Sequence, residues 1–161
     1  MKENKNLVST LLGAGILVGF LDGLAAVIQT LVNNGNLVKT FQFIASGIFG
    51  TSAFSGGNTM VALGVLFHFC IAFIWTLIFF FLYPRLKLNS INWIITGILY
   101  GLVVWAGMNF VVLRLSNTPA LPFTWTGAIR SMLILIVAIG LPLSFLARRR
   151  YTKSGVVVKT T

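Results

Sequence analysis

Acidic side chains are almost absent from this sequence. Glu3 and Asp22 are the only two acids among 161 residues, against 12 lysines and arginines, and the formal net charge is +10. There is also a single histidine, His68, and a single cysteine, Cys70. One cysteine excludes an internal disulfide, and the ligand spacing of a zinc or haem site is missing. We therefore expect no metal and no cofactor, and we expect Cys70 to be a small core residue.

The motifs of soluble enzymes are missing as well. The sequence contains no Walker loop, no nucleophile elbow and no HExxH pair of zinc ligands. An intramembrane hydrolase needs a Ser–His, Asp–Asp or metal-ligand set, and one internal acid with one histidine does not supply it. We predict that the protein is not an enzyme and has no catalytic residues.

Charged residues of either sign are scarce, and apolar residues replace them. Only 9% of the chain is charged and 57% is hydrophobic, whereas a soluble domain contains about 25% charged residues. Several runs reach the roughly 20 apolar residues that a helix needs to cross a bilayer. The short alternating segments of a membrane β-barrel are absent. The predicted fold class is therefore all-α: a polytopic membrane protein, with a bundle of four transmembrane helices in one integral domain, residues 1–161.

The apolar runs and their breaks set the predicted boundaries. The four spans are predicted at residues 7–32, 59–83, 90–113 and 125–147, with a flexible tail at 151–161. Pro84 is expected to stop the second span and Pro142 to interrupt the fourth, because proline lacks the N–H that a helix interior uses.

A shorter helix is predicted between the first two spans. Residues 41–54 are moderately apolar but rich in Gly, Ser and Thr, and are too few for a confident span. Two interpretations remain open for this segment. It is either an amphipathic helix lying in the membrane interface, or a partly inserted, re-entrant segment whose backbone is covered by protein or water.

Basic residues indicate the orientation. If the N-terminus is cytoplasmic, nine of the 12 Lys and Arg residues lie on the cytoplasmic side and three on the other, so the positive-inside rule predicts that both termini are cytoplasmic. The location expected is the bacterial inner (plasma) membrane, and the basic charge is assigned to topology rather than to nucleic acid. Arg148, Arg149 and Arg150 are interpreted as lipid-headgroup anchors at the end of the last span.

Polar residues inside the spans form a predicted cluster. With the N-terminus inside, a rise of about 1.5 Å per residue puts four side chains in the outer half of the membrane: Asp22, His68, Asn109 and Arg130. An unpaired charge in the membrane is costly, by about 2.5–3.5 kcal/mol on insertion scales. We therefore expect Asp22 to face the bundle and to contact His68 or Arg130.

Glycines recur at four-residue spacing in two spans. Gly15, Gly19 and Gly23 lie on one face of the first span, and Gly97 and Gly101 on one face of the third. Small residues let membrane helices approach closely. The stripes are interpreted as packing faces within the bundle; the alternative is a dimerisation face. The partners considered are membrane lipid, a second copy of the chain, or another membrane protein.

Several stretches carry a family resemblance: IASGIFGTSAFSGG, LGVLFHF, GILYGLVVWAGMNFVVLRLSNTP and GLPLSFLARR. Together, from Gly19 to Arg149, they resemble a group of small four-helix bacterial inner-membrane proteins similar to the YagU-type conserved membrane proteins. The resemblance implies fold and location, and no chemistry. This chain has Arg114 where the group is expected to have proline, so a shared role of that turn is in doubt.

Three functional hypotheses follow. The first is a non-enzymatic integral membrane protein that acts through helix packing or association and through its outer polar cluster. The second is a small transporter or channel in which Asp22 and His68 form a protonatable pair. The third, with the least support, is a membrane enzyme acting on lipid.

Overall fold

The computed structural model describes residues 2–120 and 122–153, and within these ranges the regular structure is entirely helical. The α-helices are α1 (Lys2–Val32), α2 (Leu37–Phe49), α3 (Gly57–Arg85), α4 (Trp93–Gly107), α5 (Leu113–Leu115), α6 (Trp125–Leu135) and α7 (Leu141–Lys153). Short 3₁₀ helices, η1 (Gly50–Ser55) and η2 (Leu88–Ser90), and π-helical turns, η3 (Met108–Val112) and η4 (Ile136–Gly140), connect or interrupt them.

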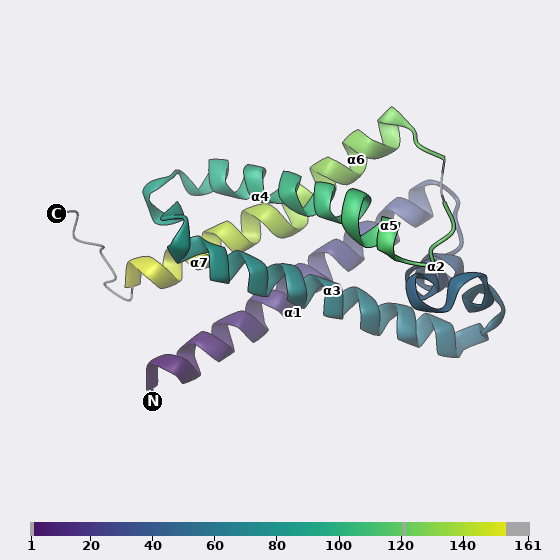
Figure 1. Cartoon of the computed structure of the whole chain (residues 1–161), viewed down its shortest axis with the longest axis horizontal. Coiled ribbons are helices and arrows are strands. Elements are labelled where there is room, and N and C mark those ends of the chain that lie inside the picture. Colours follow the sequence, from purple (N-terminus) through teal and green to yellow (C-terminus); the bar gives the residue numbers. More distant parts are fainter. Residues whose placement is uncertain (1, 121, 154–161) are drawn as a thin grey trace.

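Four of the described helical stretches are long and apolar enough to cross a membrane. They are Leu7–Val32, Gly57–Arg85, Trp93–Leu115 and Trp125–Thr152. The prediction of an all-α, four-span membrane protein is confirmed. In Figure 1 the start of α1 and the end of α7 lie at one end of the bundle, together with the α3–α4 connection. The other end carries α2 and the connection from α5 to α6, so successive spans run in opposite directions.

The sequence predicts that Pro84 stops the second span, and this prediction is wrong. Helix α3 continues through Pro84 to Arg85, beyond the predicted boundary at residue 83. Proline cannot donate to the carbonyl four residues earlier, which is that of Phe80. The hydroxyl of Tyr151, on α7, instead donates to the Phe80 carbonyl at 3.4 Å. A tertiary contact thus replaces the missing helical hydrogen bond.

The third and fourth spans also differ from their predicted limits. Span three begins at Trp93 rather than at residue 90, because the Asn92 side chain caps it by accepting from the Ile94 N–H at 2.8 Å. Span four runs through the π-helical turn η4, just before Pro142, and continues beyond residue 147 to Thr152. The predicted tail is therefore wrong for residues 151–153, which belong to α7; residues 154–161 lie outside the described residues.

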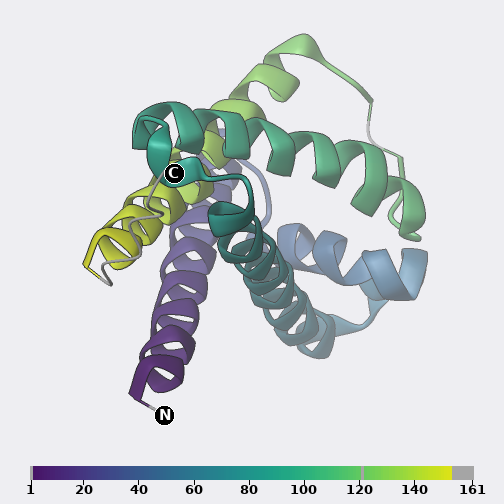
Figure 2. The same cartoon turned by 60° about the vertical axis from the view of Figure 1, so that its left-hand side comes forward.

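The short helix begins four residues earlier than predicted. Asn36 caps α2, because its side-chain oxygen accepts from the Lys39 N–H at 3.2 Å. The helix ends at Phe49, and the rest of the predicted 41–54 segment is the 3₁₀ helix η1. Figures 1 and 2 show α2 lying across the end of the bundle, packed on α3, instead of running along the spans. This direction fits a helix in the interface plane.

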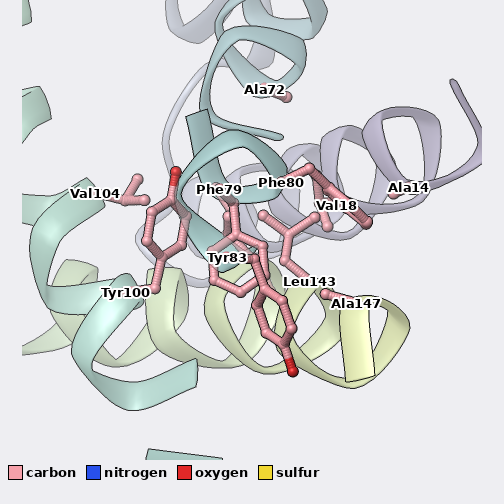
Figure 3. Packing of buried hydrophobic residues seen from close by; sticks show 12 residues of the cluster. Ala14, Val18, Ala72, Phe79, Phe80, Tyr83, Tyr100, Val104, Leu143 and Ala147 are labelled. Atoms are coloured by element: carbon pink, nitrogen blue, oxygen red, sulfur yellow. The ribbon is translucent and has the colours of Figure 1, made fainter. Parts of the chain in front are cut away.

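A buried aromatic core lies where α3, α4 and α7 meet, in the last two turns of α3. The Phe79 ring lies 4.5 Å from Tyr100 and 5.5 Å from Tyr83, measured between ring centroids. Leu143 and Val18 close this core from α7 and α1, and both are fully buried (Figure 3). The Tyr100 hydroxyl donates to the Trp75 carbonyl at 2.5 Å and joins α4 to α3. Since lipid is as apolar as the core, such packing and hydrogen bonds hold the helices together.

Both glycine stripes lie at helix contacts within the chain. Gly15 and Gly19 face the rings of Phe73 and Phe69 on α3, so the first stripe packs against α3. Gly101 faces Ile136, in the π-helical turn η4, and Gly97 likewise meets Leu141 and Gly140. The two stripes therefore do not face each other. Each permits a close approach to a different helix of the same chain.

Adding a methyl group at Gly101 tests the second contact. A Cβ built there would lie 2.5 Å from the Ile136 Cα, which is backbone and cannot rotate away. We expect Gly101→Ala to lower the free energy of unfolding by about 1–3 kcal/mol, as overpacking does. Gly13→Ala, where a Cβ meets nothing within 4 Å, is the matched control. Equal unfolding midpoints of the two variants in an SDS titration would contradict this packing.

Candidate polar site between α1 and α3

The inward face of α1 carries Asp22. Ala14 and Val18 on this face are buried in the core, with 2% and 0% of their surface exposed. Asp22 follows Val18 by four residues, or one helical turn, and so lies on the same face. Phe20 and Leu24, which are 60% and 44% exposed, lie on the opposite face. The carboxylate therefore points into the bundle and not toward lipid.

His68 of α3 contacts this face with both ring nitrogens. Its Nε2 lies 2.9 Å from the carbonyl oxygen of Gly19, and its Nδ1 lies 4.0 Å from the Asp22 carboxylate. The His68 side chain is 12% exposed and that of Asp22 22%. A Cβ at Gly23 would lie 3.1 Å from Nε2. The first glycine stripe thus brings the imidazole close enough to reach the backbone of α1.

These two contacts fix where the protons lie. A carbonyl oxygen only accepts hydrogen bonds, so Nε2 must carry the hydrogen that binds Gly19. In neutral imidazole the other nitrogen, Nδ1, then presents a lone pair toward Asp22. At 4.0 Å the two atoms lie beyond hydrogen-bond distance. The interaction between the two side chains in this geometry is therefore electrostatic, or is bridged by water.

The other two predicted members of the cluster lie elsewhere. Asn109 donates to the Trp105 carbonyl of its own helical stretch at 2.8 Å. Arg130 is exposed and donates to the Asn33 side chain at 3.3 Å, just beyond the end of α1. Neither hydrogen bond involves Asp22 or His68, so the structure brings together only two of the four predicted members. Helical rise predicts depth, but the direction of each side chain around its helix depends on packing and, at Asn109, on the π-helical turn η3.

The three arginines at the end of α7 do not share one environment. Arg149 lies over the Phe145 ring, 5.4 Å from its centroid, and is exposed like Arg148. Arg150 is partly buried and donates to the Thr10 hydroxyl at 3.1 Å, which joins α7 to α1. Cys70 is exposed on α3, and the expectation that it is a core residue is wrong.

The sequence did not predict the contact between Asn117 and the end of α2. The backbone N–H of Asn117 donates to the Gly47 carbonyl at 3.0 Å, and its side chain donates to the Ile48 carbonyl at 3.1 Å. The last carbonyls of a helix have no partner within it, and here the loop after α5 supplies one to α2. The sequence alone indicates that asparagine is a common capping residue. It does not indicate that Asn117 caps α2, which is distant in the sequence.

No family model, no curated protein and no solved structure matches this chain. Among the described residues, no three His, Cys, Asp or Glu side chains lie together as a metal site requires. The candidate site is therefore the pair itself, Asp22 with His68.

A double-mutant cycle measures the coupling within this pair. Asp22→Leu leaves the His68 Nδ1 without a partner, and His68→Leu leaves the carboxylate without one. We expect each to destabilise the protein, and the double variant to lose less than the sum by about 0.5–3 kcal/mol. Leu24→Ala combined with His68→Leu is the control and should be additive, because Leu24 lies on the opposite face. Additivity in both cycles would show that the pair does not interact.

Proposed function

We propose that this chain is a non-enzymatic, multi-pass protein of the bacterial inner membrane, in which Asp22 and His68 form a polar clasp between α1 and α3. The observation that carries the proposal is the orientation of His68. One ring nitrogen binds the Gly19 backbone while the other faces the Asp22 carboxylate at 4.0 Å. A single side chain thus joins two helices through a carbonyl and an acid.

A clasp of this kind suits an intramembrane acid. Charged groups in the membrane are costly, and such residues pair or meet water in the bundle interior. The Gly19 carbonyl satisfies the Nε2 of His68, and the Nδ1 of the same ring lies 4.0 Å from the acid. No third polar group is required, which agrees with the separate partners of Asn109 and Arg130.

The location and orientation belong to the same proposal. An even number of spans would put both termini on one side of a membrane, and the excess of basic residues on that side supports a cytoplasmic assignment. The resemblance to YagU-type membrane proteins implies the same location. Membrane lipid is the partner we propose for the exposed apolar faces of the spans.

A small proton-coupled transporter is the second candidate. It is favoured by one observation: Asp22 keeps 22% of its side chain exposed although it lies on the inward face of α1. A partly accessible acid beside a histidine is an arrangement in which a proton can be taken up and released. The clasp and the transporter differ in whether that proton exchanges across the membrane.

Asp22→Asn separates the two functions. The amide of asparagine can donate to Nδ1 of neutral His68, so the clasp survives while the titratable acid is lost. We expect the parent protein in proteoliposomes to give the same proton flux as protein-free vesicles, measured with an enclosed pH-sensitive dye under a potassium diffusion potential. We also expect Asp22→Asn to keep the parental melting temperature and Asp22→Leu to lower it.

A different outcome would favour the transporter. Parental flux above that of protein-free vesicles, removed by Asp22→Asn in a protein that still melts at the parental temperature, would contradict the clasp as the main role. Leu24→Asn provides the control for an added amide on the lipid-facing side of the same helix.

A further inference from the structure

A cleft separate from the polar pair opens at the end of the bundle that carries α2. It has a volume of about 570 Å³ and lies between the end of the third span, the start of α6 and the connection between them. Ligand pockets have volumes of about 300–1,000 Å³. Figure 1 shows the α5–α6 connection at the end of the molecule opposite the start of α1 and the end of α7.

The lining of the cleft changes from charged to apolar along its depth. Arg114 lies one residue before the end of the third candidate span, where a helix that crosses a membrane would reach its surface. Trp105 lies nine residues deeper, roughly 13 Å along the helix at 1.5 Å per residue. Phe43, Phe110 and Leu113 add apolar surface to the walls. A molecule that fills this cleft is therefore charged at the membrane surface and apolar below it.

The sign of that charge follows from Arg114. Its guanidinium has no hydrogen-bond or ion-pair partner among residues 2–120 and 122–153. Asp22, the one acid whose side chain the structure describes, does not line the cleft. Guanidinium groups bind phosphate through two parallel charge-assisted hydrogen bonds. The free cation at the mouth of the cleft is thus complementary to a phosphate headgroup.

Uncharged polar groups in the cleft are already engaged. The Trp105 Nε1–H donates to the Ser131 hydroxyl at 2.9 Å, and this hydroxyl donates to the Ala128 carbonyl at 3.0 Å. Asn109 donates to the Trp105 carbonyl. Trp105, Ser131 and Asn109 thus each use a polar group within the protein, and the apolar walls around them suit an acyl chain.

We propose that this cleft binds one anionic phospholipid, with its phosphate on Arg114 and an acyl chain against Trp105 and Phe110. A cleft on the other half of the bundle provides a contrast. It has a volume of about 600 Å³ and is lined by apolar residues of α1 and α3 with Tyr151, and none of the lining side chains that the structure describes is charged. That surface offers nothing to select a headgroup, whereas the Arg114 cleft does.

Native mass spectrometry of the purified full chain in neutral detergent tests the proposal. With phosphatidylglycerol and phosphatidylcholine in equal amounts, we expect one phosphatidylglycerol to be retained about fivefold more often, as one basic group at a membrane surface contributes about 1 kcal/mol. Arg114→Gln should abolish this preference, and Ala128→Phe, which fills the cleft from α6, should remove the bound lipid. Arg130→Gln is the matched control, because Arg130 is exposed near the same end but does not line the cleft.

Each other outcome counts against the proposal. Equal retention of the two lipids by the parent, or an unchanged preference in Arg114→Gln or in Ala128→Phe with parental helical circular dichroism, would show only general lipid contact. Displacement of phosphatidylglycerol by glycerol phosphate would show a site for the free phosphate and overturn the assignment to lipid. Arg114 is exposed at a helix end, so Arg114→Gln is expected to fold.

Discussion

The close approach of α1 and α3 over glycine is the constraint on which the polar pair depends. At Gly19 the nearest atoms to an added Cβ are those of the Phe69 ring, the closest at 2.7 Å, and at Gly23 they belong to His68 itself. A side chain at Gly19 would have to displace the Phe69 ring, and one at Gly23 would press on the His68 ring. The imidazole would then lose the Gly19 carbonyl, and the acid would be left in the bundle without its partner. Packing and polar chemistry are therefore set by the same small residues.

The helices divide into two groups that meet at an aromatic layer. Helix α3 packs on α1 and α2, and α4 packs on α6, η4 and α7, while α1 also packs on η4 and α7. Phe79, Tyr83 and Tyr100 join α3 to α4 toward the end of α3 that leads into α4 (Figure 3). Figure 2 shows the ends of α4 and α6 diverging beyond this layer. The Arg114 cleft lies at the diverging end, whereas the Asp22–His68 pair lies within the first group.

Hydropathy predicts the fold because the membrane requires long apolar helices, and their count and order follow directly from the sequence. The inward orientation of Asp22 was also predictable, since an acid in the membrane needs a partner. The wrong predictions have a common origin in tertiary contacts. Tyr151 supplies the hydrogen bond that Pro84 cannot make, and Asn33 binds Arg130 at the rim of the bundle. Such partners are distant in sequence and depend on the rotation of each helix.

The state of the His68 ring tests the central claim most directly. The chain has a single histidine, so labelling with ¹⁵N-histidine gives one pair of ring-nitrogen signals in solid-state NMR of the protein in lipid bilayers. If His68 is clasped by Gly19 and Asp22, its Nε2 carries a hydrogen in both the neutral and the charged ring. Asp22→Leu should then change the Nδ1 signal much more than the Nε2 signal. A neutral ring with its hydrogen on Nδ1 and a bare Nε2 would contradict the hydrogen bond to Gly19, and with it the clasp.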